Sequence, residues 1–158
     1  MGKNKKEGIK VTGMFRINIT EDGKLVGDSG WKKNQVTNLG FNQYLVSAIG
    51  SIAGSKYVSH AAVGTGGAPA AADTTLSGEQ SVRNAVTAAT SSGSKTVRFT
   101  GTFASADSFV TATKNLSNIG LFNTSTAAGG TLFAGNTYAS SSVFTNQNLN
   151  YTYDIIFS

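Results

Sequence analysis

Apolar and polar residues alternate along much of this chain, and the alternation predicts β-strands. Between residues 9 and 20 most apolar side chains occupy odd positions and polar side chains lie between them. A period of two is typical of a strand with one buried face. The segment Glu21–Lys24 contains Asp-Gly, which favours a tight hairpin turn. We therefore expect a returning strand over roughly residues 25–36, with a bulge or loop at Gly27–Gly30.

One short helix is expected near residues 38–49. Thr37 or Asn38 offers an N-cap, and Gly50 offers a stop. The residues expected on its buried face are Phe41, Leu45 and Ala48 or Ile49.

The rest of the chain shows repeated short apolar runs separated by Gly-, Ser- and Asn-rich turns. The strands expected there are Tyr57–Val63, Ser81–Ala89, Lys95–Phe103, Phe109–Thr113, Asn118–Phe122, Thr131–Tyr138 and Val143–Phe157. The last run would extend for about 50 Å, longer than most strands, so a bend or bulge is expected within it. This spacing predicts an all-β fold, either an antiparallel β-sandwich or a jelly-roll-like barrel.

Length and charge divide the chain into a basic N-terminal arm, residues 1–8, and a single β domain, residues 9–158. The formal net charge is +5, of which residues 1–33 carry +4. The candidate partner-binding residues are Lys3, Lys5, Lys6 and Lys10. They fit a solvated tail, a tail that docks on an acidic protein neighbour, or a tail that faces nucleic acid, and the near-neutral body makes nucleic acid the weaker partner.

No apolar run approaches the roughly 20 residues that cross a bilayer, so no membrane insertion is expected. The first ten residues lack the apolar stretch of a signal peptide, and we expect the mature protein to begin at Met1.

The residue types that carry catalysis are scarce. The chain has no cysteine and one histidine, His60, which lies in an apolar run and is expected to be a hydrogen-bonded strand residue. The acids Asp73, Glu79, Asp107 and Asp154 are not at metal-ligand spacing from it, although a structural metal at a subunit contact stays open. The glycines of Gly64–Gly67 lack the lysine and the following helix of a phosphate loop. We expect no enzyme activity and no cofactor.

The remaining polarity consists of short hydroxyl and amide side chains. Only 13% of residues are charged, and Ser, Thr, Asn and Gly lose little rotamer entropy when they are ordered. A surface with few charges also avoids the cost of desolvating unpaired ions at a subunit contact. This composition favours repeated assembly.

Several segments together carry a family resemblance. They are Val36–Gly40, His60–Leu76, Glu79, Arg83, Asn118–Asn123 and Gly130–Ala134. Across residues 36–158 the chain resembles small structural proteins of tailed-bacteriophage virions. The most specific part is a glycine-proline loop that ends in Asp-Thr-x-Leu-x-x-Glu. Its structural residues are Gly64, Gly66, Gly67, Pro69, Asp73, Glu79 and Arg83. Asp73 is expected to accept backbone N–H bonds, and Glu79 is expected to pair with Arg83.

The resemblance implies a virion structural protein, with capsid decoration favoured over a tail, collar or fibre component. In that reading the protein forms a homo-oligomer, with a trimer favoured, and binds the major capsid protein on the outside of the head. It would be made in the host cytoplasm and reside on the capsid surface. A different alternative is a carbohydrate-binding module. Its candidate stacking residues are Trp31, Tyr44, Tyr57, Tyr138, Tyr151 and Tyr153.

Overall fold

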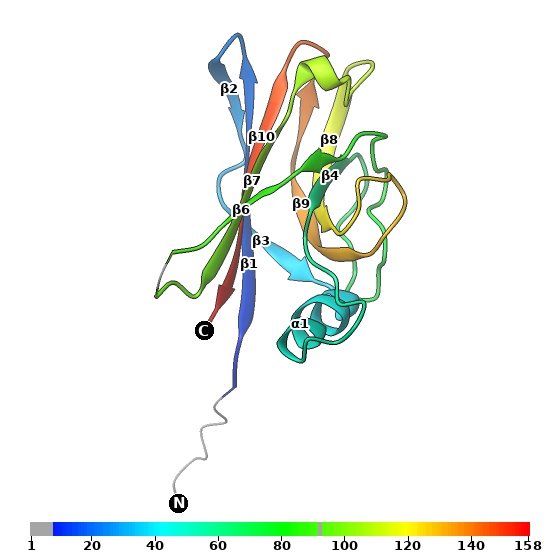
Figure 1. The fold of residues 1–158 in the computed structure, drawn as a ribbon. Coiled ribbons are helices and arrows are strands. Elements are labelled where there is room, and N and C mark those ends of the chain that lie inside the picture. Colours follow the sequence, from blue (N-terminus) through cyan, green and yellow to red (C-terminus); the bar gives the residue numbers. More distant parts are fainter. Residues whose placement is uncertain (1–7, 92) are drawn as a thin grey trace, which may run out of the picture.

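The computed structural model describes residues 8–91 and 93–158, so Lys3, Lys5 and Lys6 lie outside the described residues. Within these ranges the chain forms a 10-stranded antiparallel sheet that is nearly closed into a barrel, with one short helix beside it (Figure 1). The expected all-β class is confirmed.

The strands follow the alternating segments of the sequence. They are β1 (Val11–Glu21), β2 (Lys24–Asp28), β3 (Lys32–Val36), β4 (His60–Gly64), β5 (Asn84–Ala85), β6 (Thr87–Ala89), β7 (Thr96–Phe103), β8 (Lys114–Phe122), β9 (Leu132–Val143) and β10 (Asn148–Phe157). The helix comprises a π-helical part, Gly40–Val46, and α1 (Ser47–Ile49), and a 3₁₀ turn covers Ser105–Asp107.

Two corners join the two halves of the barrel. The hydrogen-bonded order is β5-β4-β8-β9-β3-β1-β10-β7-β6, and β2 pairs with β1. At one corner, the first half of β3 pairs with β1 and its second half pairs with β9. At the other, β5 pairs with β4 and β6 pairs with β7, with only Val86 between them. The result lies between the sandwich and the barrel that the sequence suggests.

The core fills the space between these halves. The alternation in the sequence correctly predicts which residues of β1 and β10 are buried in it. Phe15, Ile17 and Ile19 of β1 are buried, and the facing odd positions of β10 are buried as well. Phe15 stacks on Tyr153 of the paired strand with ring centroids 5.5 Å apart.

The chain between β4 and β5 adds a cover outside the barrel. Leu76 from this segment joins Ala62, Phe122 and Leu132 in a second buried cluster. Strand β8 is therefore buried on both faces along its second half, which is why that part of the sequence reads as a continuous apolar run.

The helix differs from the expected one in its winding. The cap is confirmed, since Gly40 N donates to Thr37 Oγ1 at 2.9 Å. However, Tyr44 is the buried aromatic residue, while Phe41 is 41% exposed and Ile49 is 87% exposed. A π-helix bonds residues five apart, so side chains four apart no longer share one face.

Two of the expected strands are wrong, and three are shorter or divided. One of the three is the strand expected over residues 25–36, which forms β2 and β3 with an interruption close to the expected one. Phe109–Thr113 is irregular, although Phe109 and Val110 are buried. β4 begins only at His60, and Tyr57 is 76% exposed. The expected Ser81–Ala89 strand divides at Val86, because each piece pairs with a different neighbour.

The segment Val143–Phe157 is not the single strand that was expected. The bend expected within it is a full turn that separates two strands. Gln147 N donates to Phe144 O at 3.1 Å, and Phe144 N donates to Gln147 Oε1 at 3.0 Å. Val143 ends β9, and Asn148 begins β10 in the opposite half of the barrel. The odd-position pattern continues through the turn because both strands face the same core.

Candidate functional site

The predicted glycine-proline loop is closed by a short backbone ladder at its base. Thr65 N and Gly66 N each donate at 3.1 Å, to Gly78 O and Ser77 O. Asn118 of β8 is buried, and its Nδ2 donates to Gly67 O at 3.1 Å and to Ser77 O at 2.9 Å. The loop is thus fixed onto the outer face of β8.

Two of the loop glycines are required by close approach. A Cβ on Gly64 would lie 2.6 Å from Asn118 Oδ1, and one on Gly66 would lie 2.3 Å from Ser77 Oγ. A Cβ on Gly67 would meet nothing within 4 Å. Pro69 is buried against Gly135 of β9. These contacts give the loop a structural role.

The two expected side-chain interactions of this segment are confirmed. Asp73 Oδ2 accepts the N–H of Ala70 at 2.8 Å. Glu79 accepts two hydrogen bonds from Arg83, at 2.6 Å from Nε and 3.1 Å from Nη2.

Arg83 lies at the centre of a buried cluster. Its side chain has no exposed area, and its guanidinium carbon lies 3.6 Å from the ring centroid of Phe122. Its Nη1 donates to Thr124 O at 3.0 Å. Because its donors bind Glu79 and Thr124 and its guanidinium packs on Phe122, Arg83 holds the loop against β8.

His60 lies near this cluster, at the start of β4. Its Nδ1 is 2.8 Å from Ser59 Oγ. Burial lowers the pKa of the imidazole, and the nearby charge of Arg83 lowers that pKa further. A catalytic triad uses a carboxylate to stabilise the imidazolium, whereas the charge acting on His60 is a cation. Among residues 8–91 and 93–158, no three His, Asp or Glu side chains gather into a group that could hold a metal ion.

Four of the six candidate stacking residues are part of the core. Tyr44, Tyr138, Tyr151 and Tyr153 are at most 6% exposed, so their rings cannot stack on a ligand. Trp31 is 43% exposed and Tyr57 is 76% exposed.

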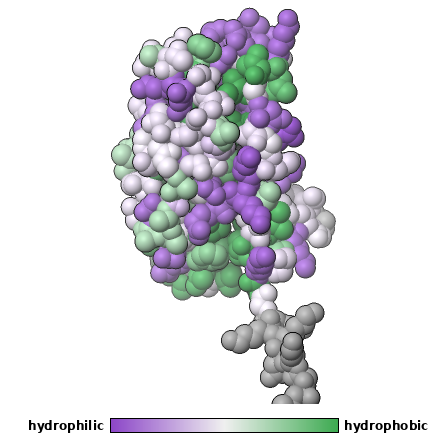
Figure 2. Space-filling view, turned by 180° about the vertical axis from the view of Figure 1, so that it is seen from behind, coloured by the Kyte–Doolittle hydropathy of each residue, from purple (hydrophilic) through white to green (hydrophobic). Residues whose placement is uncertain are grey.

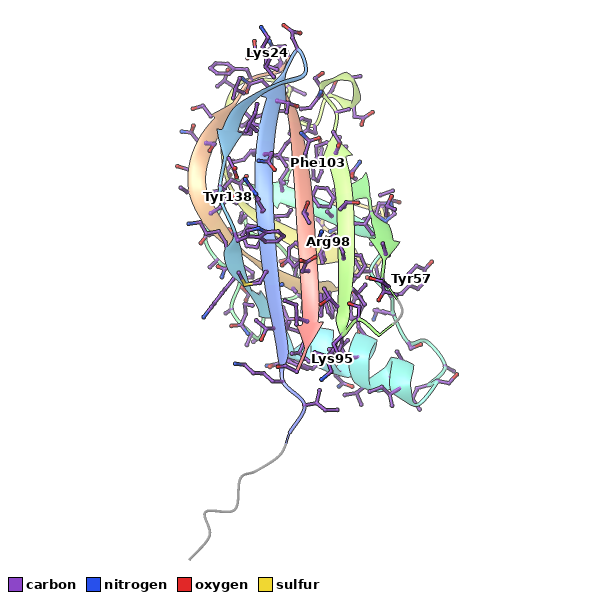
Figure 3. All side chains as sticks on the ribbon, turned by 90° about the vertical axis from the view of Figure 1, so that its left-hand side faces the viewer. Lys24, Tyr57, Lys95, Arg98, Phe103 and Tyr138 are labelled. Carbon is purple, nitrogen blue, oxygen red and sulfur yellow. The ribbon has the colours of Figure 1, made fainter. Side chains whose placement is uncertain are left out.

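An apolar surface lies at the end of the barrel where the chain enters from residue 8. We call it the arm-end surface; its exposed apolar residues are Ile9, Val46, Ile49, Ile52 and Tyr57, and its lysines are Lys10, Lys56 and Lys95. Green side chains gather at this end in Figure 2, and Tyr57 and Lys95 mark it in Figure 3. A groove of about 190 Å³ opens there between the helix and the ends of β7 and β10.

Lys10 is the only predicted arm lysine inside the described residues. Its backbone exchanges two hydrogen bonds with Ser158, at 2.7 and 2.9 Å, which extends the pairing of β1 with β10. The exposed apolar residues beside it were missed, because the helical pattern placed Ile49 in the core and the strand pattern placed Tyr57 there.

A second polar group lies on the outer face of β7 and β10, where 52% of the Arg98 side chain but only 11% of the Asp154 side chain is exposed. Arg98 Nε and Nη2 each donate to a carboxylate oxygen of Asp154, both at 2.8 Å. The guanidinium carbon of Arg98 lies 5.9 Å from the ring centroid of Trp31. The sequence places Asp154 on this face, but the pairing with Arg98 depends on strand register, which alternation alone does not give.

Comparisons with known proteins add no relative: no family model, no curated protein and no solved structure matches this chain. Within residues 8–91 and 93–158, the structure contains no helix with the length and apolar character needed to cross a bilayer.

Proposed function

We propose that this protein is a structural subunit of a tailed-bacteriophage virion, and that it decorates the outer surface of the capsid. The observation that carries the proposal is the arm-end surface, where apolar side chains with 59–87% exposure lie beside three lysines. A soluble monomer rarely exposes apolar residues in such a cluster, which instead is typical of a protein–protein contact.

The charge distribution supports an acidic partner at this surface. Each of the three arginines forms an ion pair within the chain, with Asp28, Glu79 and Asp154. The surplus positive charge therefore belongs to lysines, and Lys3, Lys5, Lys6 and Lys10 in the first ten residues belong to it. We propose that the lysines and the apolar residues together contact the major capsid protein, in a homo-oligomer that is a trimer.

Binding to purified capsids of the encoding phage tests the role of the lysines. The variant in which Lys3, Lys5, Lys6 and Lys10 are all replaced by Gln should bind at least ten-fold more weakly at low salt. At low salt the attraction between these lysines and an acidic protein surface is least screened, so its loss has the largest effect. The matched control replaces Lys24, Lys32, Lys33 and Lys114 by Gln, which removes the same charge elsewhere, and it should bind within about two-fold of the parent. Equal loss in both variants would contradict a localised contact.

Position in the particle is tested by electron microscopy of gold-labelled protein on purified virions. Label over the head supports decoration. Label confined to the tail or collar would replace decoration by the alternative structural role, and mass photometry of the free protein tests the trimer.

A further inference from the structure

The outer face of β1, β10 and β7 carries a polar surface that the proposed virion role does not use. Strand register places Met14, Asp154, Arg98 and Ala89 in one row across this face. The next row consists of Arg16, Thr152, Thr100 and Thr87. The face is therefore rich in hydroxyl groups, and it looks toward the viewer in Figure 3, with Arg98 near its middle.

A cavity of about 380 Å³ lies beside Arg98 on this face. Arg98 and Asp154 line it together with Ala89 and four hydroxyl residues, Thr90, Ser91, Ser94 and Thr96. This volume lies in the range of small-ligand sites, roughly 300–1,000 Å³, but the lining is unusually polar for such a site. A ligand rich in hydroxyl groups matches it better than an apolar one.

Trp31 provides the apolar element of the same surface. Its ring is close enough to Arg98 for a cation–π contact, yet 43% of the residue remains exposed. Trp31 does not line the cavity, but Arg98 lies between the two and approaches both. The surface thus presents a flat apolar face and a polar rim, an arrangement that suits amphipathic ring ligands.

We propose that Trp31, Arg98, Asp154 and this cavity form a binding site for a neutral oligosaccharide. One pyranose unit places its C–H face on Trp31, and the next unit enters the cavity. There, vicinal hydroxyls donate to the Asp154 carboxylate and accept a hydrogen bond from Arg98 Nη1. Arg98 binds Asp154 through Nε and Nη2, so Nη1 takes no part in that pair.

The charge of the site favours a neutral glycan over an acidic one. Arg98 is neutralised by Asp154, and the nearby Arg16 is neutralised by Asp28. An anionic sugar would thus meet a carboxylate without a free arginine to offset it.

The single tryptophan of the chain makes the test direct. The full-length protein is titrated with lactose, maltose and cellobiose while the emission of Trp31 is recorded, and a broader set of neutral glycans is screened on an array. We expect a saturable change in emission with at least one neutral oligosaccharide, and binding at least ten-fold weaker for sialyllactose. Preference for the sialylated probe would overturn the proposal, as would the absence of saturable binding by any neutral glycan.

Variants then locate the site by calorimetry. Trp31→Ala removes an exposed side chain and should weaken binding at least ten-fold, while Trp31→Phe should retain part of it. Arg98→Lys keeps the charge but loses the two-pronged geometry and should weaken binding about ten-fold. Tyr57→Ala, the matched loss of an exposed aromatic residue at the arm-end surface, should bind within two-fold of the parent. Unchanged binding by Trp31→Ala would place any glycan elsewhere and overturn the site; thermal melts confirm that each variant is folded.

Discussion

The buried tyrosine hydroxyl groups of the core differ in their hydrogen-bond partners. Tyr153 accepts a hydrogen bond from Asn34 Nδ2 at 2.6 Å, and Tyr151 donates to Asn84 Oδ1 at 2.9 Å. Among the described residues, the hydroxyl of Tyr138 is buried without a partner. Burial raises the pKa of all three phenols well above its usual range, so each stays neutral at physiological pH.

Each asparagine in these pairs depends on a glycine in a neighbouring strand. A Cβ on Gly13 would lie 1.5 Å from Asn34 Oδ1, and one on Gly101 would lie 2.3 Å from Asn84 Oδ1. The odd-position pattern in the sequence identifies the tyrosines as core residues. It cannot identify their hydrogen-bond partners, because Asn34 and Asn84 come from segments far away in the chain.

Replacing the two kinds of tyrosine separates these environments. Tyr153→Phe should lower the free energy of unfolding by about 1–3 kcal/mol, because the half-buried amide of Asn34 loses its acceptor. Tyr138→Phe is the matched control and should be neutral or slightly stabilising, since no recorded hydrogen bond is lost. Urea unfolding of both variants makes the measurement, and a larger loss for Tyr138→Phe would contradict these assignments.

The loop glycines allow a second test at single positions. Gly66→Ala should lower the free energy of unfolding by about 1–3 kcal/mol, because its Cβ would overlap Ser77 and force the loop to move. Gly67→Ala enters open space at the adjacent position and should change that free energy by less than about 1 kcal/mol. Equal losses in urea unfolding would show that the loop is not packed in this way.

Single elements were predictable where one local pattern determines them. The strands β1 and β7 follow from alternation, and the Thr37 cap follows from its place before the helix. Alternation also places the core residues of β10, but it does not show where that strand begins. The winding of the helix and the division at Val86 did not follow, since both depend on contacts with distant strands. The Glu79–Arg83 pair was predictable because its two residues are four apart in the sequence.

The Glu79–Arg83 pair gives a prediction for the loop as an element. Glu79→Gln should lower the free energy of unfolding by about 3–5 kcal/mol, because it leaves a fully buried guanidinium without its carboxylate. The double variant Glu79→Leu with Arg83→Met should recover most of that loss, because no charge then remains buried. Thermal or urea unfolding compares the two, and a double variant less stable than the single one would show that the ion pair itself is net stabilising.

Across the whole molecule, the candidate surfaces were harder to predict than the core. The lysines of the first ten residues are evident from composition, but the apolar residues beside Lys10 come together only in the folded chain. The same is true of Trp31, Arg98 and Asp154, which come from three separate segments. Core patterning is local in sequence, whereas a surface site depends on register and on how the sheet curves.

Three ionisable groups give the whole protein a common pH dependence. Hydrogen bonds from Arg16 and Gly30, with the charge of Arg16, lower the pKa of Asp28 to about 2 from its ordinary 3.8. Hydrogen bonds from Gln147 and Asn146 lower the pKa of Glu21, and burial lowers that of His60. Each group therefore binds fewer protons in the folded state than in the unfolded state, so stability rises with pH through the range between its two pKa values.

The expected result is a midpoint of thermal unfolding that is highest above the ordinary pKa of histidine, about 6.5, and falls as the solution is acidified toward pH 2. His60→Gln should remove the part of this slope just below pH 6.5, because glutamine does not titrate. Asp28→Asn should reduce only the slope between pH 3.8 and about 2, the interval between the ordinary and folded pKa of Asp28. Thermal melts from pH 2 to pH 8 measure both effects. A midpoint that rises on acidification, or a slope near pH 3 that is the same with and without Asp28, would contradict the Arg16–Asp28 pairing as a source of acid sensitivity.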